Sequence, residues 1–170
     1  MNETKFLVDN NALVMLTASR IRSEFFRENC SVTADVLWEA SENPEHSFLA
    51  TIVIAATPAL LEQIRVVMKS VEPGDTGLVD LYKNLGTADP GLVASALEAR
   101  AADDGKFFAD EWVLVTNDHA VEKLAAAFNV STIKPKQLAE RIDAQLRITS
   151  PLEKPLKQIG VGNGIQAQDL

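Results

Sequence analysis

The stretch WVLVT, residues Trp112–Thr116, constrains the fold most strongly, because apolar, aromatic and β-branched residues follow one another without a turn residue. Such a run is typical of a strand buried on both faces, as in a parallel sheet covered by helices. A second short apolar run, Phe6–Val8, predicts another buried strand. Both runs end in acid and amide side chains and then pass into apolar patterns with helical spacing, which favours an α/β architecture.

The intervening sequence supplies the expected helices. A weak strand is predicted at 130–133, and residues 48–56 fit either a strand or a helix. Caps, prolines and apolar spacing predict helices at 10–28, from Ser31 or Thr33 to Pro44, from Pro58 to Pro73, and at 76–85, 89–103, 119–128 and 135–147. Alternating strands and helices imply an α/β fold with a central, mostly parallel sheet flanked by helices in three layers, α/β/α.

The chain length of 170 residues suits one domain, which we place at 1–148. Residues 149–170 are rich in Gly and Pro and poor in large apolar groups, so they predict a flexible or loosely docked tail. This tail could also reach a partner or a second subunit.

The composition excludes some classes of function. A net charge of −8 argues against a generic basic nucleic-acid binder, but not against an enzyme that reaches phosphates through bound cations. Cys30 is the single cysteine, so no intrachain disulfide can form, and we expect it to be a buried bystander in a cytoplasmic protein. The start of the chain lacks the pattern of a signal peptide, and the most apolar run, 48–56, is too short to span a membrane.

Four acids are candidate site residues. Asp9 and Asp118 follow the predicted strands, Asp89 opens a predicted helix, and Glu39 lies in a helix among apolar neighbours. Ligands of open α/β sheets bind at the carboxyl ends of the strands. Glu39 is costly to bury without a cation, and no Lys or Arg occurs between Arg27 and Arg65.

Carboxylates that converge in one cleft take up protons unless cations neutralise them. Oxygen ligands favour Mg²⁺ or Mn²⁺, and these ions suit phosphodiester hydrolysis. Nearby cations that could help to hold nucleic acid are Arg20, Arg22, Arg27, Arg65 and Lys69. Each acid also has a simpler interpretation, since Asp9, Asp89 and Asp118 could cap helices and Glu39 could lie on a solvated face.

The four motifs together resemble the PIN-domain family, and within it the VapC-like ribonuclease toxins of toxin–antitoxin systems. The segments that carry the resemblance are FLVDNNALVML around Asp9, VTADVLWEA around Glu39, TADPGLVASALEA around Asp89 and WVLVTNDHAVEKLAAAFNV around Asp118. The resemblance covers roughly residues 5–147 and implies a Mg²⁺- or Mn²⁺-dependent endoribonuclease. In it the four acids would bind the metal, while Asn11 and Thr116 would orient them.

The resemblance further implies a homodimer, an RNA substrate and, for the toxins, inhibition by a small antitoxin. The sequence departs from the family at Asn10, where Thr or Ser is commoner, and at Pro90-Gly91 after Asp89. The segment between Glu39 and Asp89 and the tail are longer than in typical toxins. Alternatives are a PIN-fold protein of RNA processing, a non-catalytic binding module that keeps the fold, and a receiver-like domain with Asp9 as phospho-acceptor.

Overall fold

The computed structural model describes residues 3–71, 88–103 and 109–149, except for the side chains of Ala88, Asp89 and Thr149. The helix expected at 76–85 and the tail beyond Thr149 therefore lie outside the described residues.

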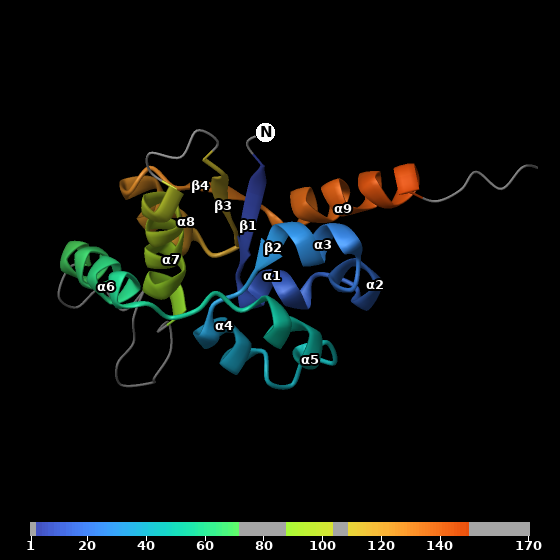
Figure 1. The fold of residues 1–170 in the computed structure, drawn as a ribbon, viewed down its shortest axis with the longest axis horizontal. Helices are drawn as coiled ribbons and strands as arrows, with labels where there is room; N and C mark the ends of the chain where they lie inside the picture. The colour runs from blue at the N-terminus through green and yellow to red at the C-terminus, as the bar shows by residue number, and fades with distance from the viewer. Residues whose placement is uncertain (1–2, 72–87, 104–108, 150–170) are drawn as a thin grey trace, which may run out of the picture.

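A four-stranded, all-parallel sheet forms the centre of the fold, with the strand order β2-β1-β3-β4 (Figure 1). Its strands are β1 (Thr4–Val8), β2 (Cys30–Ser31), β3 (Glu111–Val115) and β4 (Ser131–Ile133). Strands β1 and β3 pair in the middle, with Val8 opposite Val115. The last three residues of both strands are buried, as their continuous apolar sequences predicted.

Helices cover both faces of this sheet and complete three layers, α/β/α (Figure 1). One face carries α3 (Glu24–Asn29) and α9 (Pro135–Thr149), which contact each other, and the other carries α7 (Ala88–Asp103) and α8 (His119–Ala127). The remaining helices are α1 (Asn10–Val14), α2 (Ala18–Ile21), α4 (Ala34–Glu39), α5 (His46–Leu49) and α6 (Pro58–Ser70). Helix α4 lies near the end of β1 and contacts α1 and α7. The α/β class predicted from the sequence is confirmed.

The single helix expected at 10–28 is wrong, because the structure has the three short helices α1, α2 and α3 there. Thr17 and Ser23 occupy the N-cap positions that restart the chain. The Ser23 hydroxyl donates to the carbonyl of Arg20 and accepts from the N–H of Phe26. Serine and threonine compete with a continuing helix through such local hydrogen bonds, so the apolar spacing alone misled the prediction.

The segment between β2 and α6 also differs from expectation in detail. Residues 48–56 form neither a full strand nor a full helix, because α5 passes into the 3₁₀ turn η1 (Ala50–Ile52) and Val53 makes an isolated bridge to Val32. Thr33 caps α4 through the N–H of Val36, which settles the choice between Ser31 and Thr33. Helix α4 ends at Glu39, before Pro44. Thr57 caps α6 as expected.

Cys30 lies in the core, as the sequence suggested, and burial raises the pKa of its thiol far above its ordinary range. Among the described residues, no helix is both long and apolar enough to cross a membrane.

Candidate functional site at the carboxyl edge of the sheet

Asp9 is the first residue after β1 and is held at the edge of the sheet by its own backbone. Its N–H donates to the carbonyl of Val115, 3.1 Å away, and so continues the pairing of β1 with β3. Asp9 as a whole is buried, with 3% of its surface exposed. Asp9 stands at the N-cap position of α1 without a regular side-chain cap, although the N–H groups of Asn10 and Asn11 lie close enough to stabilise its carboxylate.

Thr116 joins the two acids that end β1 and β3. Its hydroxyl donates to Oδ2 of Asp9 at 2.8 Å and accepts the backbone N–H of Asp118 at 3.0 Å. Thr116 is fully buried, so this arrangement is shielded from water. The structure therefore gives Thr116 the contact with Asp9 that an orienting residue would need.

Asp118 caps α8, since its Oδ1 accepts the N–H of Ala120 at 2.7 Å. The simpler interpretation of this acid is therefore correct for one of its oxygens. A cap uses only part of the acceptor capacity of a carboxylate. Asp118 can thus serve as a cap and still present an oxygen to a ligand.

The pKa of Asp9 lies above its ordinary value of 3.8, chiefly because burial penalises the charged form. The hydroxyl of Thr116 and the N–H groups of Asn10 and Asn11 oppose this shift, whereas the charge of Asp118 adds to it. The net direction is upward because these hydrogen bonds do not replace the lost water. A cation bound beside Asp9 would relieve the penalty.

Glu39 lies on the exposed side of α4, which corrects the expectation that its apolar neighbours bury it. Among those neighbours, Trp38 is 72% exposed, and only Val36 and Ala40 are buried in the core. The pKa of Glu39 is nevertheless raised, first by partial desolvation and then by the charges of Asp9 and Asp35. The structure thus brings Glu39 within electrostatic reach of the end of β1.

Asp35 is an acid that the sequence reasoning missed. It precedes Glu39 by four residues on α4, a spacing that places both carboxylates on one helix face. Its Oδ2 lies 3.4 Å from the position that a Cβ on Gly91 would occupy, so it reaches the first turns of α7. The i, i+4 spacing of the two acids was the signal that could have identified it.

Asp89 lies in the first turn of α7, which begins at Ala88, and not at the cap position that the sequence suggested. Its side chain lies outside the described residues, so its contribution to the site stays a prediction. The side chain of Asn11 is exposed and makes no hydrogen bond to the acids in the described part of the chain, although the backbone N–H of Asn11 stabilises the Asp9 carboxylate. Its expected orienting role also stays a prediction.

We refer to Asp9, Asp35, Glu39, Thr116 and Asp118 as the carboxyl-edge site. None of its acids forms an ion pair with another described residue. The described Asp, Glu, His and Cys side chains contain no group of three that is placed to hold a metal ion by itself. The set of donors is carboxylate oxygen, which is the chemistry that Mg²⁺ and Mn²⁺ prefer.

Three of the arginines expected to help with phosphate binding are engaged elsewhere. Arg20 makes two hydrogen bonds to Asp143 on α9, of 2.9 and 2.8 Å. Two further ion pairs, Arg22 with Glu45 and Arg65 with Glu62, occupy the other two. The carboxyl-edge site is therefore electronegative, with no cation from these arginines to offset its acids.

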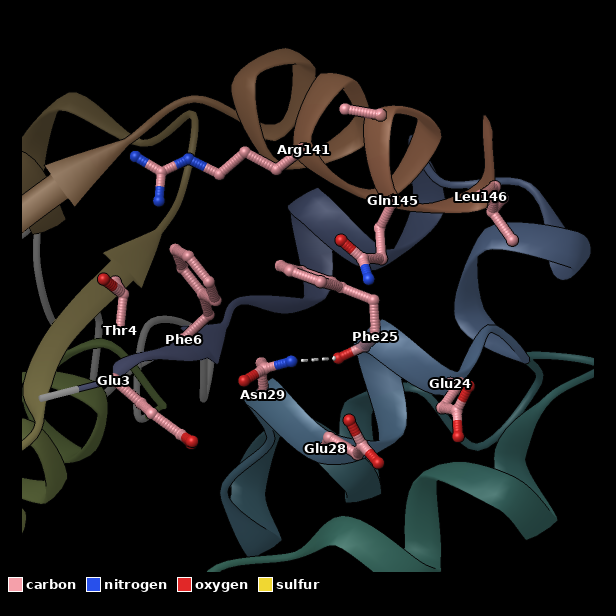
Figure 2. Close-up of a pocket in the computed structure, with 11 residues that line it drawn as sticks. Glu3, Thr4, Phe6, Glu24, Phe25, Glu28, Asn29, Arg141, Gln145 and Leu146 are labelled. Atoms are coloured by element: carbon pink, nitrogen blue, oxygen red, sulfur yellow. Dashed lines mark hydrogen bonds between the residues drawn. The ribbon is translucent and has the colours of Figure 1, made fainter. Parts of the chain in front are cut away.

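Of two cavities in the described part of the chain, one lies beside these acids and the other lies at the opposite end of β1. A groove of about 380 Å³ between α1 and the segment after α4 is lined by Asn10, Val14 and Glu39, and it opens beside the carboxyl-edge site. A larger cavity, which we name the amino-end pocket, has a volume of about 670 Å³ and lies at the opposite end of β1, between α3 and α9 (Figure 2). In it the guanidinium of Arg141 lies 5.3 Å from the centre of the Phe6 ring.

The fold and the site together define an α/β protein with a parallel sheet and a cluster of acids at its carboxyl edge. No protein-family model matches the chain, and no curated protein is significantly similar to it. Among solved structures, the chain is similar to PAE2754 from Pyrobaculum aerophilum, with 20% sequence identity and a TM-score of 0.47. The similarity covers 84% of this chain and 99% of that one.

Proposed function

We propose that this protein is a PIN-like, Mg²⁺- or Mn²⁺-dependent endoribonuclease, which hydrolyses RNA phosphodiester bonds. The observation that carries the proposal is the Thr116 hydroxyl, which donates to Asp9 and accepts the N–H of Asp118. Through this link, acids at the ends of two neighbouring parallel strands are fixed at one edge of the sheet. The electrostatic coupling of Glu39 to Asp9 adds an acid from a third element.

The acids fit a divalent cation in charge and in chemistry. The pKa values of Asp9 and Glu39 are raised, as expected where negative charges face one another or lose water without a counter-ion. In the proposal, Asp9, Glu39, Asp89 and Asp118 would hold one or two ions, which supply water activation and charge stabilisation at the phosphodiester. Thr116 keeps the Asp9 carboxylate oriented, and Asn11 would do the same from α1.

Further parts of the proposal follow from the same resemblance to PIN-domain toxins. The protein would act in the cytoplasm as a homodimer, and a small antitoxin protein would inhibit it. These expectations concern partners, and each can fail while the nuclease activity stands.

The test is cleavage of a total-RNA pool by purified protein in EDTA, Mg²⁺ or Mn²⁺, with the wild type and Asp9→Asn. We expect metal-dependent cutting by the wild type that the variant lacks. The matched control is Glu24→Gln, because Glu24 is an exposed acid in the amino-end pocket. Equal cutting by wild type and Asp9→Asn would refute the assignment of Asp9.

If neither protein cuts, a thermal shift with Mn²⁺ separates two cases. Stabilisation that disappears in Asp9→Asn would indicate an intact metal site in an enzyme that cuts only selected RNAs, since a ligand that binds only the folded state stabilises it. The absence of any shift would favour a fold without catalysis.

A further inference from the structure

Exposed apolar side chains lie on the elements that carry the proposed catalytic acids. Val14 is 74% exposed and Met15 56% exposed at the end of α1, which starts directly after Asp9. Trp38 is 72% exposed on α4, next to Glu39. We name Val14, Met15 and Trp38 the apolar rim. The other large apolar side chains that are exposed in the described part of the chain lie on α6 and α9.

The apolar rim is held in place by the surrounding structure. Helices α1 and α4 contact each other, and Thr33 caps α4 while Val36 anchors it in the core. The Asn117 amide donates to the sulfur of Met15 at 3.0 Å, which links the rim to the end of β3. Trp38 thus stands on an anchored helix next to Glu39 in sequence, and its ring makes no contact with another described aromatic residue.

The negative charge of the protein limits how it can bind RNA, and this bears on the role of the Trp38 indole. The net charge is −8, so the protein as a whole repels a polyanion, and Arg20, Arg22 and Arg65 are already ion-paired. An RNA chain would then be bound through metal ions held by the acids and through contacts that do not depend on charge. Stacking of a nucleobase on an aromatic face is such a contact, and it accepts any base.

We infer that Trp38 stacks on an unpaired nucleobase of a single-stranded RNA and so positions the neighbouring phosphodiester at the carboxyl-edge site. The inference rests on the proposed function, because it assigns Trp38 a positioning role at that site. A protein partner fits the rim less well, since Asp9 and Glu39 stand on the elements that carry it and charged residues are depleted from the cores of protein interfaces.

Intrinsic fluorescence can report this stacking directly. The chain has two tryptophans, and Trp112 lies on β3 with its indole nitrogen buried, so Trp38 is the exposed reporter. The probe is an eight-nucleotide oligoadenylate with Ca²⁺ in place of Mg²⁺ to slow hydrolysis. We expect quenching by this probe, little quenching by an abasic chain with the same number of phosphates, and no ligand-dependent quenching in Trp38→Phe.

Affinity and kinetics measured with variants complete the test. Trp38→Ala should weaken binding of the oligoadenylate about ten-fold, and Trp38→Phe only about two-fold, because a phenyl ring retains part of the stacking. In cleavage assays Trp38→Ala should raise KM with little change in kcat. The control is Ile148→Ala, which removes an equally exposed apolar side chain on α9.

The outcomes distinguish this inference from the proposed function. Base-dependent quenching without cleavage would support Trp38 as a stacking platform and would count against the nuclease. Cleavage that depends on Asp9 but is unchanged in Trp38→Ala would overturn the inference and leave the nuclease intact. Loss of self-association in Trp38→Ala, with unchanged RNA binding, would overturn it in favour of an interface between copies of this chain.

Discussion

The two ends of β1 carry acids in opposite electrostatic situations. At the amino end, Lys5 donates to Glu3 at 2.7 Å, and this contact lowers the pKa of Glu3. At the carboxyl edge, burial raises the pKa of Asp9, and burial together with neighbouring acids raises that of Glu39. The same chemical group is stabilised as an anion at one end and destabilised at the other.

Cavity size and the electrostatics of the acids point to opposite ends of β1. The amino-end pocket is the larger of the two cavities, and its walls include the aromatic rings of Phe6 and Phe25, whose centres are 6.1 Å apart (Figure 2). Its acids Glu24 and Glu28 are exposed to water. Perturbed carboxylates next to one another are the better indicator of a functional site, since a fold tolerates their cost where a ligand offsets it.

The largest effect is expected from removing a charge at the carboxyl edge. Asp118→Asn should lower RNA cleavage by at least about 100-fold, because it removes a proposed metal ligand. It should change the free energy of unfolding by less than about 1 kcal/mol, since Asn caps helices nearly as well as Asp. Initial rates and urea unfolding measure the two effects, with Glu24→Gln as the control at the other end. Cleavage at the wild-type rate would remove Asp118 from the site.

Thr116→Val should destabilise the fold by about 1–3 kcal/mol, because the acceptor on Asp9 and the donor on Asp118 lose their buried partner. Thr116→Ser keeps the hydroxyl and should recover most of this loss. Chemical unfolding of the three proteins tests the contact. If valine and serine behave alike, the hydroxyl does not link the two strands as its geometry suggests.

The pH dependence of stability should separate the two ends of β1. The pKa of Asp9 in the folded protein is raised above 3.8, its ordinary value, so the unfolded state loses its proton first as pH rises. In EDTA the protein should therefore lose stability as pH rises through the window between the unfolded and the folded pKa of Asp9. Asp9→Asn should therefore be the more stable protein in EDTA above the window, and equal to the wild type below it. Each unit of pKa difference corresponds to about 1.4 kcal/mol.

The acid at the other end gives the opposite sign. The pKa of Glu3 is lowered below 4.5, so its contribution to the stability of the fold is present above that pH and is lost as pH falls.

Adding Mg²⁺ should reverse the order of stability of wild type and Asp9→Asn, because only the wild type would bind the ion well. Denaturant titrations between pH 3 and 7, with and without metal, provide the measurement. An Asp9→Asn protein that is less stable in EDTA at every pH would contradict this account.

Strands β1, β3 and β4 and the positions of Asp9, Thr116 and Asp118 could be predicted because they depend on local sequence. A continuous apolar run defines a buried strand, and the residue after it must lie at the edge of the sheet. Thr33 and Thr57 likewise mark helix starts through hydrogen bonds within three residues. These features need no knowledge of distant contacts.

The predictions that were wrong concern positions where side-chain hydrogen bonds compete with a continuing helix, or where the outcome depends on packing between distant parts of the chain. Ser23 and Thr17 interrupt a helix that apolar spacing favoured, and β2 is only two residues long, so its pairing with β1 carries no pattern of its own. The exposure of Glu39 depends on how α4 packs against α1 and α7, which its apolar neighbours in sequence could not reveal. The same packing decides that Asp35 reaches Gly91.

The smallest effect is expected in the amino-end pocket, from Arg141→Ala. The guanidinium lies over the Phe6 ring at 5.3 Å, and such a contact at an exposed site contributes about 0.5–1 kcal/mol. Arg141→Lys should retain part of that stability. Cleavage should be unchanged in both variants, because this pocket lies at the opposite end of β1 from the acids. Urea unfolding and initial cleavage rates test both statements together. Slower cleavage by a stable Arg141→Ala protein would show that the two ends of β1 are coupled, and the amino-end pocket would then need a place in the mechanism.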